Sequence, residues 1–118
     1  MLISESQAVL HFYLKDDETQ EWVAWANIMN TAIGTYSLFQ VYTNEKYRSK
    51  GYGTRILNDV IQWANRNEAT IYLGVGSWGT IGLNNDQLTK WYASVGFEPQ
   101  GYDKNGSLIM RYKGKRNS

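Results

Sequence analysis

Cysteine is absent from the 118-residue sequence, so the protein's chemistry can involve neither a disulfide bond nor a thiolate. A single histidine argues against a histidine-rich metal site and leaves carboxylates as the remaining metal ligands. No apolar run approaches the length of a membrane span, and residues 1–7 lack the basic start and apolar core of a signal peptide. We therefore expect a cytoplasmic protein that has no metal site and does not enter a membrane.

Neither sign of charge is in clear excess, because the sequence has 12 basic and 11 acidic residues and a formal net charge of +1. A nucleic-acid binder usually carries a clear positive field, so this balance does not predict a nucleic-acid partner. The length predicts one domain over residues 1–118 whose core needs no metal or crosslink. We expect the basic residues 113–118 to form a flexible tail.

The first half of the chain has the pattern of three strands. Residues 9–14 and 35–43 are rich in β-branched and aromatic side chains, and polar turn residues follow the first of these segments at 16–20. Residues 21–28 alternate aromatic and small side chains, which favours a second antiparallel strand over the alternative, a helix.

The second half changes period. From residue 54, apolar side chains recur at helical spacing. They are Ile56, Leu57, Val60, Ile61 and Ala64. Residues 70–75 then predict a buried strand, 83–95 a second helix that stops at Gly96, and the hairpin signal at 103–106 two last strands. The N-cap of the second helix is Asn84, Asn85 or Asp86. The predicted fold is therefore α+β or α/β, with a mixed central sheet in the order β-β-β-α-β-α-β-β.

The turn at residues 47–54 joins the third strand to the first helix. Gly51 and Gly53 allow the backbone to approach a ligand closely, and the helix start presents unpaired N–H groups at the positive end of its dipole. Arg48 and Lys50 add positive charge beside these donors, which predicts a phosphate site. An ordinary turn with solvated basic side chains is the alternative.

Two motifs in this order resemble the GNAT superfamily of acetyl-coenzyme A dependent N-acetyltransferases, over about residues 8 to 112. They are Arg48-x-x-Gly51-x-Gly53 at the first helix and Trp91-Tyr92-x-x-x-Gly96-Phe97 at the second. The resemblance implies that the turn binds the coenzyme's diphosphate and that the preceding strand runs along its pantetheine arm. The implied coenzyme site comprises Val41, Tyr42, Thr43, Arg48, Ser49, Lys50, Gly51, Tyr52, Gly53, Thr54 and Asn85.

The resemblance also implies a catalytic group, because a tyrosine of the second helix lies beside the sulfur in this family. Tyr92 would protonate the departing thiolate as general acid, and a backbone N–H near Tyr42 or Thr43 would polarise the thioester carbonyl. Without the resemblance, Tyr92 reads as a core aromatic and Asn85 as a helix cap.

The chain departs from the family pattern in three ways. Its N-terminus is too short for the two helices that wall the acceptor site in typical members, so that site is open or completed by a second copy in a homodimer. The glycine-rich loop at 74–82, which carries Trp78, is longer than usual, and we expect it to be mobile near the acceptor. Where some members carry a catalytic glutamate, the strand before the turn offers Gln40, Tyr42 and Thr43.

The general base is therefore left open among His11, Glu21, Asp86 and water. The function predicted from the resemblance is transfer of an acetyl group from acetyl-coenzyme A to a primary amine. That amine would be a protein lysine, an N-terminus or a small molecule, attacking directly in a ternary complex. A coenzyme- or partner-binding module with little catalytic activity is the alternative.

Overall fold

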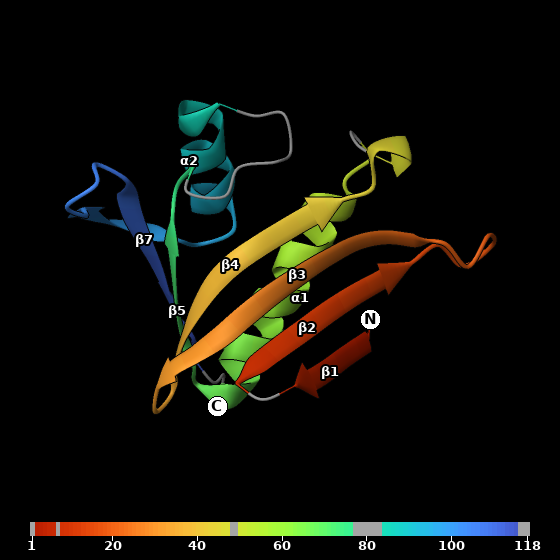
Figure 1. The fold of residues 1–118 in the computed structure, drawn as a ribbon, viewed down its shortest axis with the longest axis horizontal. Coiled ribbons are helices and arrows are strands. Elements are labelled where there is room, and N and C mark those ends of the chain that lie inside the picture. Colours follow the sequence, from red (N-terminus) through yellow and green to blue (C-terminus); the bar gives the residue numbers. More distant parts are fainter. Residues whose placement is uncertain (1, 7, 48–49, 77–83, 116–118) are drawn as a thin grey trace.

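A computed structural model describes residues 2–6, 8–47, 50–76 and 84–115. These residues form a seven-stranded sheet in the order β1-β2-β3-β4-β5-β7-β6, with two helices (Figure 1). The elements are β1 (Leu2–Ser6), β2 (Val9–Lys15), β3 (Trp22–Ala32), β4 (Thr35–Thr43), the short 3-10 helix η1 (Glu45–Tyr47), α1 (Tyr52–Asn67), β5 (Thr70–Gly74), α2 (Asn85–Ser94), β6 (Glu98–Tyr102) and β7 (Leu108–Lys113). The mixed sheet predicted from the sequence is confirmed, with one more strand than expected.

The additional strand is β1, at the edge of the sheet. It pairs antiparallel with β2, and only residues 7 and 8 separate the two strands. A five-residue edge strand that pairs on one side needs no continuous apolar pattern, which is why the sequence did not reveal it. The tight connection agrees with the expectation that no pair of helices fits between the first two strands.

Helix α1 covers one face of the N-terminal strands, and it lies behind β2, β3 and β4 in Figure 1. Its buried residues are those of the predicted stripe: Ile56, Leu57, Val60, Ile61 and Ala64. They meet a row of side chains that are opposite one another on adjacent strands, Phe12, Ala26 and Val41, each 0% exposed. Each fully buried aliphatic side chain contributes about 1.5–3 kcal/mol, so this packing dominates the stability of the helix.

Strands β4 and β5 are parallel neighbours, with α1 in the connection between them, as the predicted β-α-β unit requires. Their pairing is short, because only Thr35–Ser37 of β4 oppose Thr70–Tyr72 of β5. Beyond these pairs the two strands diverge, and β4 and β5 point apart in Figure 1. β5 instead pairs along its whole length with β7, which runs antiparallel to it.

Helix α2 begins with a capping box in which Asn84 and Gln87 exchange side-chain and backbone hydrogen bonds of 2.9 Å. Of the three candidate caps, Asn84 is therefore the one used. Gly96 follows the helix with φ +111°, a backbone conformation that suits glycine at a helix end. None of the helices in the described part of the chain combines the length and hydropathy needed to cross a lipid bilayer.

The chain stays in the fold beyond the expected start of the flexible tail. Lys113 is the last residue of β7, and Gly114 is buried, with its N–H donating to the Ala69 carbonyl at 2.8 Å. The N–H of Lys115 donates to Asn65 Oδ1 at 3.0 Å. This segment was missed because it docks through backbone groups, which composition does not reveal. Residues 116–118 lie outside the described part of the chain.

Candidate active site

The site begins where β4 and β5 separate. An extended ligand between two diverging strands can bind their backbones as an added strand would. The last residues of β4 include three predicted coenzyme contacts, of which Val41 and Thr43 are 0% and 5% exposed. The ring of the third, Tyr42, stacks on Trp25 with a centroid distance of 4.4 Å. Their side chains are thus packed, so a ligand in the gap would meet mainly the β4 backbone.

The predicted phosphate turn lies at the N-terminus of α1. Gly51 is its N-cap with φ +83° and ψ 4°, the left-handed conformation that glycine adopts without a steric penalty. The first helical hydrogen bond runs from the Arg55 N–H to the Gly51 carbonyl, so the amides at residues 52–54 precede the helical ladder. Among the described residues no side chain caps this end of α1. The turn therefore has the donors that an anion requires.

The two glycines of this turn have different structural roles. A Cβ added at Gly51 would meet nothing within 4 Å, so the space beside it is open. A Cβ at Gly53 would lie 3.1 Å from Thr43 Oγ1 and 3.4 Å from the Trp91 ring. Gly53 is therefore needed for α1 to pack closely on the end of β4 and on α2. Open space beside the residue is found at Gly51, and the approach of a ligand to the Gly53 backbone stays a prediction.

The two sequence motifs meet in space through a tryptophan. Trp91 Nε1 donates a hydrogen bond of 2.9 Å to Thr54 Oγ1, which ties α2 to the first turn of α1. The Trp91 side chain thus braces the candidate phosphate site. Trp91 is part of the second motif, but its contact with Thr54 was not predicted from the sequence.

A second contact supports the turn from Glu21, the last residue before β3. Tyr47 of η1 donates its hydroxyl to Glu21 Oε2 at 2.7 Å, and Lys46 Nζ lies 3.3 Å from the same oxygen. The Tyr47 ring meets the ring of Tyr52, the first residue of α1, edge-on at 5.9 Å. The Tyr47 hydrogen bond, and then Lys46, lower the pKa of Glu21. Glu21 is thus a weak base with its carboxylate occupied, which disfavours it as the general base.

His11 lies in a hydrogen-bonded ladder across the sheet face opposite α1. Its Nδ1 is 2.6 Å from Asn27 Oδ1, and Asn27 Nδ2 donates to Gln40 Oε1 at 2.5 Å. Because an amide oxygen accepts, neutral His11 carries its proton on Nδ1. β3 separates His11 from β4, so the imidazole is not adjacent to the gap where the thioester is expected. This placement disfavours His11 as the general base too.

Tyr92 lies on α2 in the core and is 1% exposed. Its ring centroid is 5.8 Å from that of Phe97, and burial raises the pKa of its hydroxyl above the ordinary value of 10.0. The hydroxyl therefore stays protonated at any physiological pH, which is the form that can donate. The structure supports the packing role of the ring and leaves the catalytic role to be tested.

Asn85 lies at the start of α2, and a Cβ at Gly76 would collide with its side-chain oxygen. This contact places Asn85 at the carboxyl end of β5. Arg48, Ser49 and the loop with Trp78 lie outside the described residues. Within the described residues, no group of three or more His, Cys, Asp or Glu side chains is arranged to hold a metal ion.

Several solved structures share this fold at low sequence identity. The ribosomal-protein-S18-alanine N-acetyltransferase from Escherichia coli gives a TM-score of 0.75 at 18% identity, over 97% of this chain and 74% of that chain. An aminoglycoside 6'-N-acetyltransferase complexed with coenzyme A gives 0.69 at 17% identity, over 91% and 73%. The dodecameric spermidine N-acetyltransferase from Vibrio cholerae gives 0.73 at 17% identity, over 91% and 66%.

The model of the acetyltransferase (GNAT) family matches residues 3–97, whereas no curated protein matches. The match spans both predicted motifs, from the β-strands that lead to the turn through Trp91, Tyr92 and Phe97. The chain therefore belongs to the GNAT family of acetyltransferases.

Proposed function

We propose that the protein transfers an acetyl group from acetyl-coenzyme A to a primary amine, by direct attack within a ternary complex. The observation that carries this proposal is the gap between β4 and β5, which ends beside the N-terminus of α1, where no side chain of the described residues makes a cap. A long ligand with a diphosphate at one end and an acyl thioester at the other matches both features. The acceptors named for the relatives, a protein alanine, an aminoglycoside and spermidine, are all amines.

The reaction forms one bond and breaks one. The amine lone pair attacks the thioester carbonyl carbon, the C–S bond breaks, and the sulfur leaves with the electron pair and then takes up a proton. The amine loses one proton to a base. We assign stabilisation of the developing oxyanion to a β4 backbone N–H at Tyr42 or Thr43.

We assign to the Tyr92 hydroxyl the role of hydrogen-bond donor and proton source for the departing sulfur. A thiol has a pKa of about 8.5, below the value of about 10 for an unperturbed tyrosine, and burial raises the pKa of Tyr92 further. Complete transfer of the Tyr92 proton to the thiolate is therefore uphill by at least about 2 kcal/mol. Tyr92 would act first as a hydrogen-bond donor that stabilises the thiolate, with net protonation following.

For the proton lost by the amine, Asp86 and water stay as candidates. Glu21 is engaged with Tyr47 and Lys46, and His11 lies two strands from β4. The carboxylate of Asp86 is exposed in the first turn of α2, beside Asn85.

A coenzyme- or partner-binding module with little catalysis is the second candidate. The observation that favours it is the tight connection of β1 to β2, which leaves no helices there to wall an acceptor site. In a homodimer the second copy could supply the missing wall of the acceptor site, and the protein could then act as an enzyme.

The two candidates differ in measurable ways. Saturating acetyl-coenzyme A should raise the melting temperature, because a ligand that binds only the native state stabilises it by about 2.7 kcal/mol at one hundred times its Kd. ATP at the same concentration should leave the melting temperature unchanged. Release of free coenzyme A thiol should then depend on an added amine, with the acetylated amine identified by mass spectrometry. Stabilisation without transfer to any peptide or small amine would favour the binding module. Equal stabilisation by both ligands, or by neither, would refute the coenzyme site.

A further inference from the structure

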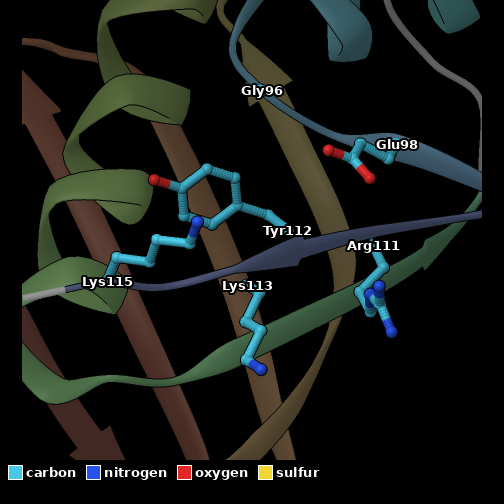
Figure 2. A pocket seen from close by; sticks show the side chains of 6 residues that line it. All are labelled: Gly96, Glu98, Arg111, Tyr112, Lys113 and Lys115. Carbon is cyan, nitrogen blue, oxygen red and sulfur yellow. The ribbon is translucent and has the colours of Figure 1, made fainter.

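Two of the surface cavities lined by the described residues are of similar size and opposite charge. One, of about 360 Å³, lies on the β7 side of the molecule (Figure 2). Its ionisable lining is mostly basic: Arg111, Lys113 and Lys115 are positively charged, and Glu98 is the one acidic residue among those that line it. A positively charged molecule would be repelled there. The second cavity, of about 320 Å³, has a different lining and a different position.

The second cavity lies at the carboxyl end of β5, between the first turn of α2 and the β6–β7 hairpin. Val75 and Gly76 form its floor, and the Val75 N–H donates to the Leu108 carbonyl at 2.8 Å, which holds the hairpin against β5. Asn85 of the second motif is part of its wall. Because β4 and β5 separate at this same end of β5, the cavity shares Asn85 and the carboxyl end of β5 with the candidate active site.

The chemistry of this second cavity suits a cation. Asp86 is the one charged side chain among the described residues that line it, and no lysine or arginine is among them. Within the described residues, no hydrogen bond or ion pair involves the Asp86 carboxylate. The ring of Tyr102, which is 74% exposed, also lines the cavity and offers a π face, and Ser107 and Thr89 add hydroxyl oxygens.

We propose that the cavity between α2 and the β6–β7 hairpin holds the distal ammonium group of a diamine acceptor, with Asp86 as its counter-ion and Tyr102 packed against it. This inference rests on the proposed acetyl transfer, because it names the class of amine that the site selects. The reacting amine would lie toward the gap between β4 and β5. A second positive charge would remain beside Asp86, so this inference leaves water, of the two candidates, as the base for the reacting amine.

The size of the effect follows from the exposure of the site. Asp86 is exposed, so solvent screens part of the attraction between its carboxylate and an ammonium group. A tenfold preference corresponds to about 1.4 kcal/mol. We therefore expect a diamine to bind about tenfold more tightly than a monoamine of the same length.

The test compares 1,4-diaminobutane with n-butylamine, using NMR titration of the protein saturated with coenzyme A. The unmodified protein should prefer the diamine about tenfold, Asp86→Asn should abolish the preference, and Asp86→Glu should restore much of it. Tyr102→Ala should reduce the preference a fewfold. Asp17→Asn, which neutralises an exposed carboxylate in the β2–β3 turn, is the matched control and should leave the preference unchanged.

The outcomes separate this inference from the proposed function. Equal binding of the two amines, or a diamine preference that survives in Asp86→Asn, overturns the inference even when acetyl transfer is observed. A preference that depends on Asp86, measured by binding without any transfer to either amine, supports the cation site and counts against the proposed acetyl transfer. A melting temperature close to that of the unmodified protein shows that Asp86→Asn is folded.

Discussion

Gly51 shows how one residue can serve ligand binding without contributing to packing. Its φ of +83° favours glycine, and the space where a side chain would project is empty of protein atoms. Gly51→Ala should therefore cost about 1–2 kcal/mol of stability through the backbone alone and weaken coenzyme binding at least about tenfold. Thermal unfolding and a coenzyme titration measure the two effects separately.

Gly34 provides the matched control, because it has φ +72° and no atom lies within 4 Å of the position that a Cβ would take. It lies in the β3–β4 turn, beside the carboxyl end of α1 and not at the N-terminus, since its carbonyl accepts a hydrogen bond of 2.9 Å from the Thr70 N–H. Gly34→Ala should lower stability by a similar amount and leave coenzyme affinity unchanged. If Gly51→Ala binds the coenzyme as tightly as Gly34→Ala does, the turn is not the phosphate site.

Substitution of Tyr92 distinguishes a catalytic role of its hydroxyl from a packing role of its ring. Tyr92→Phe keeps the buried ring beside Phe97 and removes only the hydroxyl. Turnover should fall by about tenfold to 10²-fold while coenzyme affinity is retained, because the hydroxyl would act only as the sulfur departs. Single-turnover kinetics with a good amine acceptor is the appropriate measurement. Full turnover in the variant would leave protonation of the sulfur to water or another group.

At the scale of elements, η1 connects the β2–β3 turn to the start of α1. Tyr47 and Lys46 both contact Glu21, and Tyr47 also contacts Tyr52. Glu21→Gln should loosen this connection and weaken coenzyme binding about two- to fivefold, since an exposed charged contact is worth little. A coenzyme titration of the variant measures it. A change in turnover without a change in affinity would assign Glu21 to catalysis instead.

The same contact makes a prediction about pH. The pKa of Glu21 lies below its ordinary value of 4.5 in the folded protein, so its stabilising effect is present above pH 4.5 and is lost as pH falls through the lowered pKa. The melting temperature of Glu21→Gln should therefore fall below that of the unmodified protein near neutral pH, and the two should converge in acid. Glu18→Gln, in the neighbouring turn, is the control and should show no such convergence.

At the scale of the whole molecule, the C-terminal segment closes the fold where β7, β5 and α1 come together. A Cβ at Gly114 would collide with the Ala64 carbonyl and lie 2.6 Å from the Ala69 carbonyl. Because backbone atoms cannot move aside easily, Gly114→Ala should destabilise the protein by about 1–3 kcal/mol. Chemical denaturation measures this, with Lys113→Ala, an exposed change in the adjacent residue, as the control. A stable Gly114→Ala variant would mean that the segment is not docked as described.

Periodicity predicted the parts of the fold that bury a repeating apolar pattern. The stripe of α1 and the bounds of β4 at Thr35–Thr43 were predicted correctly for this reason. β1 was missed because an edge strand has no such pattern. Pairs far apart in sequence were missed as well: Glu21 and Tyr47 meet through side chains, and so do Thr54 and Trp91. No local spacing encodes either contact.

The short β4–β5 pairing also divides the sheet into two parts, β1 to β4 and the C-terminal strands. β1 to β4 form an uninterrupted meander whose strands are joined by short turns, and such local contacts close early during folding. The C-terminal strands join that meander through three residue pairs, across a connection that contains all of α1. This joint has the fewest paired residues of any in the sheet, so we expect sub-global opening to begin there. A coenzyme bound along this joint would contact both parts of the sheet. The two parts should then unfold together when the coenzyme is bound and more independently when it is absent.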